Sequence, residues 1–303
     1  MTPKNLFITS LSIFIVIIII SCGHHDLVAE TVFNVPDEVI ILKGHTGEID
    51  SAVFSPDSQK IVTASCDKTA RIWDAAAGKE LQKFEGHTSW VNSAVFSPNS
   101  KKIVTSSWDK TARIWDAATG KELQKINGHT MCVRSAVFSP NAKTILTVGL
   151  DNTVRIWDAE TGKELQKLQG YIDTIDSAAF LPNGKIIVIT NKTSPNQTAW
   201  IWNTARGKEL QKFEENTDRF SRTVSFSPDG NVFVAVNLDN TAQICETETG
   251  KKLYKLEGHT NAVQSAVFSP DGKMIVTASW DKTARIWNWQ KIQQHLQSAI
   301  SKK

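Results

Sequence analysis

Histidine, serine or threonine, and aspartate recur together along the chain, a combination that can hydrolyse acyl bonds. A catalytic triad needs one nucleophile held against one base in one pocket. Here the residue types return at intervals of about 42 residues, as in His87, Thr105 and Asp109, and so form a series of similar sets. The chain also contains no Gly-x-Ser-x-Gly, His-Glu-x-x-His or phosphate-binding loop. We therefore predict no catalytic residues and a structural role for the recurring set.

The elements that position these residues are copies of one another. Residues 110–130 match residues 68–88 at 18 of 21 positions. A Gly-His pair recurs with the same spacing, ending at His45, His87, His129 and His259, and Gly170-Tyr171 and Glu215-Asn216 occupy its slot elsewhere. Each unit closes on a tryptophan, at Trp73, Trp115, Trp157, Trp202 and Trp287, with Cys245 in the fifth slot. Six repeats therefore run from about residue 37 to 288, closing near 74, 116, 158, 203, 246 and 288, and a fixed period of this length indicates a repeat architecture.

Each repeat predicts four short antiparallel strands. In the second repeat they cover residues 93–98, 101–107, 111–116 and 121–127, where small, β-branched and apolar side chains alternate. Turns such as Ser227-Pro228-Asp229-Gly230 suit tight hairpins. No repeat carries the helical pattern that a parallel sheet requires. The fourth strand is the most charged, which suits an outer edge, and radial repetition of four-stranded sheets gives an all-β propeller.

These residues resemble the WD40 repeat family, whose unit opens on Gly-His and ends in Trp-Asp, as Trp73-Asp74 and Trp115-Asp116 do here. The resemblance covers residues 38–288 and implies a structural hydrogen-bond tetrad in each complete unit. The matching tetrads are His45, Thr63, Asp67 and Trp73; His87, Thr105, Asp109 and Trp115; His129, Thr147, Asp151 and Trp157; and His259, Thr277, Asp281 and Trp287.

The fourth and fifth repeats depart from this pattern. Tyr171 replaces the histidine of the fourth, and an insertion around residues 191–197 removes its aspartate. The fifth has Asn216, Ala235 and Cys245 at tetrad positions and keeps only Asp239. Each lost hydrogen bond costs about 1 kcal/mol net, so we expect these two units to be the least stable part of the ring.

The two ends of the chain complement each other. The last repeat lacks a fourth strand, whereas Val39 to Leu42 form a fourth strand with no repeat before it. We predict that this segment completes the last sheet and closes a six-bladed propeller over residues 37–288, although seven blades are more usual in the family. After it, residues 289–303 predict a C-terminal amphipathic helix, because Trp289, Ile292, Leu296 and Ile300 recur at helical spacing.

The N-terminal segment is of another kind. Residues 6–20 are mostly apolar and shorter than the roughly 20 residues that span a bilayer, which favours a signal peptide over residues 1–21. Ile19-Ile20-Ser21-Cys22 resembles the lipobox of bacterial lipoproteins and implies lipidation of Cys22, with residues 22–36 as a tether. An uncleaved signal anchor is the alternative. Both predict a membrane-anchored propeller outside the cytoplasmic membrane, at the outer membrane or periplasmic face.

Composition excludes several other functions. The remaining cysteines, Cys66, Cys132 and Cys245, show no paired spacing and predict no disulfide framework. His24 and His25 beside Cys22 form only a weak metal candidate, so we predict no metal and no cofactor. The net charge is +3, and lysine and glutamate are interleaved in the repeats, so no basic stripe predicts nucleic-acid binding.

A surface remains as the candidate site. The resemblance implies that proteins or peptides bind the loop face that carries the connections from the fourth strand to the next first strand and from the second strand to the third. Carried over by position, its partner-binding candidates here are Asp50, Trp90, Asn92, Trp108, Arg134, Phe220, Arg222, Gln264 and Trp280. The three tryptophans stand outside the repeating slot, and tryptophan and arginine dominate binding hot spots. We predict a monomeric, non-enzymatic interaction platform; an enzyme with a site in the central channel and a purely structural envelope protein are the alternatives.

Overall fold

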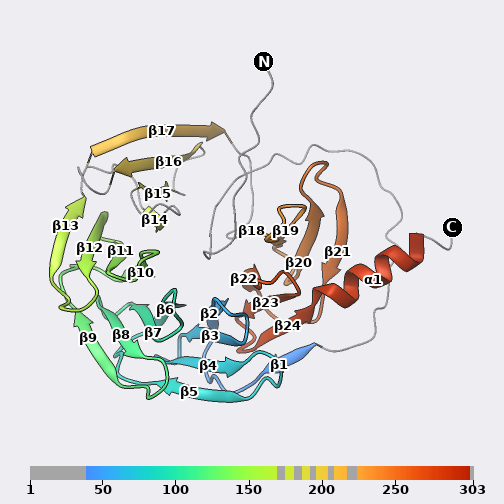
Figure 1. The fold of residues 1–303 in the computed structure, drawn as a ribbon, viewed down its shortest axis with the longest axis horizontal. Coiled ribbons are helices and arrows are strands. Elements are labelled where there is room, and N and C mark those ends of the chain that lie inside the picture. Colours follow the sequence, from blue (N-terminus) through green and yellow to red (C-terminus); the bar gives the residue numbers. More distant parts are fainter. Residues whose placement is uncertain are drawn as a thin grey trace.

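The computed structural model describes residues 39–168, 175–180, 186–191, 196–203, 208–216 and 224–300. The predicted signal peptide over residues 1–21, Cys22 and the tether over residues 22–36 lie outside this part of the chain. The described residues form 24 β-strands and one α-helix, arranged in six four-stranded antiparallel sheets. Figure 1 shows the sheets following one another around a common axis.

Five of the sheets take four consecutive strands each, ordered from the inner to the outer strand as they occur in the chain. They are β2 (Ile49–Phe54), β3 (Lys60–Ser65), β4 (Ala70–Asp74) and β5 (Glu80–Phe84); β6 (Val91–Phe96), β7 (Lys102–Ser107), β8 (Ala112–Asp116) and β9 (Glu122–Ile126); β10 (Val133–Phe138), β11 (Thr144–Gly149), β12 (Thr153–Asp158) and β13 (Glu164–Leu168); β14 (Ile175–Phe180), β15 (Ile186–Asn191), β16 (Asn196–Asn203) and β17 (Lys208–Asn216); and β18 (Val224–Phe226), β19 (Val232–Val236), β20 (Ala242–Glu246) and β21 (Lys252–Leu256).

The remaining sheet joins the two ends of the chain. It contains β22 (Val263–Phe268), β23 (Met274–Ser279) and β24 (Ala284–Asn288), and its outer strand is β1 (Ile40–Leu42). Ile40 pairs with Ile286, and Leu42 pairs with Ala284. The predicted pairing of the first strand with the last repeat is therefore present.

The hairpin turns follow from the Ser-Pro sequences. In the first repeat the Ser58 amide donates to the Ser55 carbonyl oxygen at 2.8 Å, around Pro56. The Ser55 hydroxyl also accepts from the Lys60 amide at 2.9 Å, which fixes the start of β3. The same backbone bond recurs at Ser100 and Gly272. A tight turn of this kind needs only local residues, which is why it could be predicted from sequence.

The core lies between neighbouring sheets. The inner strand β6 packs beside β2 and β10, and β22 packs beside β2 and β18. Val62 and Ile72 of one sheet share a cluster with Ile103 and Trp115 of the next. Since neighbouring sheets of the described residues bury apolar side chains against each other, one repeat alone has no complete core.

The C-terminal helix α1 (Trp289–Ile300) covers the outside of the last two sheets. Trp289 and Ile292 are buried there, and the Trp289 ring lies 6.1 Å from the Phe268 ring. Leu296 packs against the same cluster. Trp289, Ile292 and Leu296 of the predicted apolar face thus pack against the propeller. Within the described residues no helix is long and apolar enough to cross a membrane.

The insertion in the fourth repeat lengthens its outer hairpin. Strands β16 and β17 have eight and nine residues, compared with five in β4 and β5. Phe213 pairs with Ala199 in the same way as Phe84 pairs with Ala70. His87 follows Phe84 by three residues and Asn216 follows Phe213 by three, so Asn216 occupies the register position of the histidine. It differs from the histidines in its conformation, however, because it continues the strand and pairs with Asn196.

Candidate functional site on the loop face

The predicted tetrads come together as chains of side-chain hydrogen bonds. In the first repeat His45 Nδ1 lies 2.8 Å from the Asp67 carboxylate, and His45 Nε2 lies 2.7 Å from Thr63 Oγ1. Trp73 Nε1 donates to the same Thr63 Oγ1 at 2.8 Å. The histidine comes from the loop before the first strand, and the aspartate from the turn after the second. The chain of bonds therefore ties both loops of one face to the core of the sheet.

Three other repeats build the same arrangement. The distances for histidine to aspartate, histidine to threonine and tryptophan to threonine are 2.7, 2.7 and 2.9 Å at His87, 3.0, 2.7 and 2.7 Å at His129, and 2.7, 2.7 and 3.0 Å at His259. In the fifth repeat Asp239 forms an ion pair with Lys255 at 3.0 Å, and Cys245 is buried in the tryptophan slot.

The tetrad holds a neutral histidine against a charged aspartate. Burial lowers the pKa of His45 in spite of the opposing Asp67 hydrogen bond. Burial alone would raise the pKa of Asp67, but hydrogen bonds from His45 and Thr69 outweigh it and hold that pKa well below its usual range. His45 thus donates from Nδ1 to the carboxylate and accepts at Nε2 from the Thr63 hydroxyl, whose oxygen accepts from Trp73.

In three of the four complete repeats an arginine extends the tetrad to the outer strand, which was not predicted from the sequence. Arg71 lies 3.7 Å from Asp67 and 2.6 Å from Glu80 on β5. The same pairs join Arg113 to Glu122 and Arg155 to Glu164. The signal was available, because arginine and glutamate recur at fixed positions beside the tetrad residues in these repeats.

β-Bulges set the side chains at the same end of the inner strands. The pairing of the first two strands skips one residue in five sheets, and the skipped residues are Asp50, Asn92, Arg134, Asp176 and Gln264. A bulge re-aims the side chain of the extra residue. Four of the predicted partner-binding residues, Asp50, Asn92, Arg134 and Gln264, therefore stand at equivalent bulges.

Two of these bulge residues connect neighbouring sheets. The Asn92 amide donates to the Val133 carbonyl oxygen at 2.8 Å. Asp50 accepts from Trp280 Nε1 at 3.1 Å and from the Cys66 thiol at 3.7 Å, and burial raises the pKa of Asp50. Trp280 thus links the last and first sheets while its side chain remains partly exposed.

Trp90 and Trp108 behave differently from Trp280. Their rings lie 5.4 Å apart and are inclined at 60°, and the Trp108 amide donates to the Trp90 carbonyl oxygen at 2.9 Å. The two residues are 47% and 48% exposed. Met131, which is not among the predicted partner-binding residues, precedes β10 on the adjoining sheet and is 50% exposed.

Comparison with protein families identifies the fold. The family model described as "IFT122 first beta-propeller" matches residues 100–291, which is more than half of the chain. The chain belongs to this β-propeller family. The model described as "WD domain, G-beta repeat" also matches residues 37–74 and 78–116, so the propeller contains WD40 repeats.

Three curated relatives match a segment about as long as one repeat. A segment of 38 residues is 45% identical to proteins named "mRNA export factor" from Macaca fascicularis, Pongo abelii and Xenopus tropicalis. The match covers 12% of the chain and 10% of each relative's length.

Of the remaining predicted partner-binding residues, two are described by the structure and two are not. Arg134 is exposed and Gln264 is half-buried at the bulges. Phe220 and Arg222 lie outside the described residues.

The described thiols and tetrad side chains are buried or engaged with one another. Burial raises the pKa of the Cys66 thiol to about 12, and Cys132 is buried, so neither thiol is an activated nucleophile. The tetrad histidines and aspartates already bond to one another. Within the described ranges no group of histidine, cysteine, aspartate and glutamate side chains has the arrangement of a metal site.

Proposed function

We propose that this WD40 propeller is a non-enzymatic interaction platform that binds a protein or peptide on the loop face around Trp90 and Trp108. The exposed, mutually packed tryptophan pair carries this proposal. Large apolar side chains on a loop face reduce solubility unless they serve a contact, and tryptophan is enriched in binding hot spots.

The rigidity of the face supports the same function. The Trp108 amide is bonded to the Trp90 carbonyl, and the tetrad of His87 and Asp109 anchors the two loops that carry these residues. A partner that docks on loops already fixed loses less conformational entropy on binding.

The six sheets would form a closed six-bladed ring, and the propeller would act as a monomer.

The proposal includes a location outside the cytoplasmic membrane. Its support is the N-terminal sequence, in which the apolar residues 6–20 are followed by Ile19-Ile20-Ser21-Cys22. Metabolic labelling with a fatty acid should mark the wild-type protein and leave a Cys22→Ser variant unlabelled. Equal labelling of both would exclude lipidation at this residue.

The relatives' name does not extend the proposal to RNA export. Their similarity spans 38 residues, about the length of one repeat, and so supports the repeat fold alone. The interleaved lysine and glutamate residues also give the propeller no basic stripe for RNA.

Affinity purification from detergent-solubilised membranes tests the proposed face. The wild-type protein is compared with a Trp90→Ala/Trp108→Ala variant whose thermal unfolding is first shown to be cooperative. A Leu123→Ala/Leu165→Ala variant is the matched control, because these exposed leucines lie on the outer strands β9 and β13. A partner retained by the wild type and the control and lost from the tryptophan variant supports the proposal; a partner retained by all three contradicts it.

A further inference from the structure

We infer that Asn127 is a site of spontaneous covalent modification, at which the side-chain amide is lost and an aspartyl or isoaspartyl residue forms. This inference concerns the chemistry of the chain itself and is independent of the proposed binding function. It rests on the exposed Asn127-Gly128 pair, which follows β9 and directly precedes His129 of the third tetrad.

The packing of the third repeat requires the glycine of this pair. A Cβ atom at Gly128 would lie 2.7 Å from the Trp157 ring and 3.0 Å from the Arg155 guanidinium, so a side chain here would displace both groups. Gly44 and Gly86 lie against the corresponding tryptophan and arginine of their own repeats in the same way. Because the fold keeps a glycine at this position, the residue before it decides whether the pair is chemically labile.

The third repeat differs from the other complete repeats in that preceding residue. The first, second and last repeats have Lys43, Glu85 and Glu257 there, and these side chains have no amide to lose. All three are exposed, as Asn127 is, so the fold places no demand of its own on this side chain. The chain contains a second Asn-Gly pair, Asn183-Gly184, which lies outside the described residues.

The reaction consumes only water. The backbone nitrogen of Gly128 attacks Cγ of Asn127, the new N–Cγ bond closes a cyclic imide, and the Cγ–Nδ2 bond breaks. Ammonia leaves with the proton from the glycine amide. Water then opens the imide at one of its two carbonyl carbons and gives aspartate with the original main chain, or isoaspartate with the main chain running through Cγ. One water is consumed and one ammonia released, with no oxidation or reduction.

Both reacting groups are accessible in the folded protein. Asn127 and Gly128 are exposed, and Nδ2 of Asn127 donates only a long hydrogen bond to the Lys125 carbonyl oxygen, at 3.4 Å. Within the described residues the Gly128 amide donates no hydrogen bond. The nitrogen that must attack is therefore free of a competing bond.

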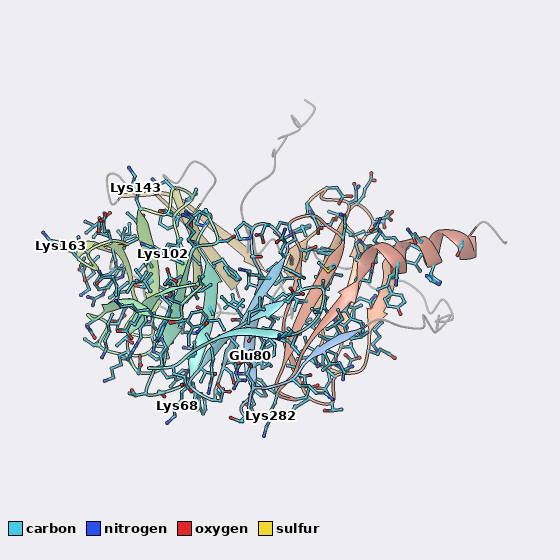
Figure 2. The ribbon with its side chains drawn as sticks, turned by 60° about the horizontal axis from the view of Figure 1, so that its bottom comes forward. Lys68, Glu80, Lys102, Lys143, Lys163 and Lys282 are labelled. Atoms are coloured by element: carbon cyan, nitrogen blue, oxygen red, sulfur yellow. The ribbon has the colours of Figure 1, made fainter. Side chains whose placement is uncertain are left out.

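The asparagines of the Ser-Pro turns are better protected. Oδ1 of Asn99 accepts from the Lys101 amide at 3.1 Å, and Oδ1 of Asn141 accepts from the Lys143 amide at 3.0 Å. Serine and alanine follow these asparagines, and their Cβ atoms hinder the approach that glycine allows. Figure 2 shows Lys143 at the edge of the molecule opposite Lys68, a loop-face residue, so Asn141 is a reference on the far face of the third sheet.

Isoaspartate would add a carbon atom to the main chain directly before a tightly bonded loop. His129 lies 2.7 Å from Thr147 Oγ1 and 3.0 Å from the Asp151 carboxylate, and the Thr130 amide donates to the same carboxylate at 3.0 Å. A longer main chain shifts the histidine relative to these partners and weakens the third tetrad. Aspartate keeps the main-chain spacing and leaves the tetrad intact.

Ageing of the full-length protein tests the inference. The purified wild-type chain is kept in mildly alkaline buffer and digested with trypsin at intervals. The digest contains residues 126–134, in which Asn127 is the only asparagine, and residues 135–143, which contain Asn141. By mass spectrometry Asn127 should lose its amide several times faster than Asn141, and an isoaspartyl methyltransferase should label the first peptide. Equal rates in the two peptides, or modification of Asn127 only after the protein is unfolded in urea, would overturn the inference.

Variants separate the covalent change from the added charge. Asn127→Glu introduces the residue type of the second and last repeats and should remain unmodified with an unchanged urea midpoint after ageing. Aged wild-type protein should have a lower urea midpoint than fresh protein, whereas freshly prepared Asn127→Asp should match fresh wild type. An aged wild type that is isoaspartyl-labelled and keeps its midpoint would overturn the effect on the tetrad. None of these measurements depends on a binding partner.

Discussion

Single residues show how a triad-like set of side chains is engaged by hydrogen bonds inside the sheet. His45 bonds to Asp67 and Thr63 at once, and Thr63 is also occupied by Trp73. The threonine oxygen therefore has its proton directed to the histidine and a lone pair directed to the tryptophan. A hydroxyl buried between two such partners has no access to a substrate, and its contribution is to stability.

Removing one tetrad hydroxyl should show the size of this contribution. In a Thr105→Val variant the buried His87 Nε2 and Trp115 Nε1 would each lose their partner. Two buried groups left unsatisfied should lower the free energy of unfolding by about 3 kcal/mol, measured by urea denaturation. Thr105→Ser, which keeps the hydroxyl, is the control. A valine variant as stable as the serine variant would contradict a stabilising role for the tetrad hydroxyl.

Individual elements depend on their neighbours for their structure. Strand β1 has only three residues, too few to be stable alone, and it is held by pairing with β24 and by Leu42. Leu42 is fully buried with Ile49 and Ile286, which lie on two different sheets. A residue near the start of the chain thus stabilises the contact between the first and last repeats.

The Leu42→Ala variant tests this junction. Deleting a buried leucine side chain should lower the free energy of unfolding by about 2–5 kcal/mol, because it leaves a cavity between two sheets. The control is Ile41→Ala on the same strand, where the side chain is 37% exposed and the loss should be much smaller. Equal losses in the two variants, measured by urea denaturation, would show that β1 contributes by pairing alone.

The whole molecule repeats one electrostatic arrangement in four sheets. Burial lowers the pKa of His45, His87, His129 and His259 from the usual value of 6.5. The partner aspartates Asp67, Asp109, Asp151 and Asp281 have pKa values below the usual 3.8, because hydrogen bonds from histidine and threonine outweigh the effect of burial. All eight groups therefore bind protons more readily in the unfolded chain than in the folded one.

The ring should consequently lose stability in two steps as the pH falls. Below about pH 6.5 the unfolded state takes up protons on the histidines first, and below about pH 4 it does so on the aspartates, so each step favours unfolding. Urea midpoints measured from neutral pH to about pH 3 should fall through both windows. A His87→Gln/Asp109→Asn variant should show a smaller fall of the midpoint in each pH window. A wild-type urea midpoint that rises between pH 7 and pH 5.5 would contradict the predicted loss of stability.

Much of the fold could be predicted from sequence because the information is local to one repeat. The histidine and aspartate of a tetrad are 22 residues apart, and the threonine and tryptophan are 10 apart, in every complete unit. These offsets recur with the strand pattern, so four strands, their turns and the tetrads follow from one repeat. The arginine-to-glutamate pairs were also local, and the recurring TARIW and KEL segments contained their signal.

The sequence by itself determined the repeating four-stranded sheet, the pairing of the chain ends and the residues of the tetrads. Only the tertiary structure decided which of the three unusual tryptophans are exposed. Trp280 reaches Asp50 across 230 residues of sequence, whereas Trp90 and Trp108 pack against each other and remain half in solvent. The physical reason is that contacts between sheets depend on how the repeats stack around the axis, and no spacing within a single repeat records that arrangement.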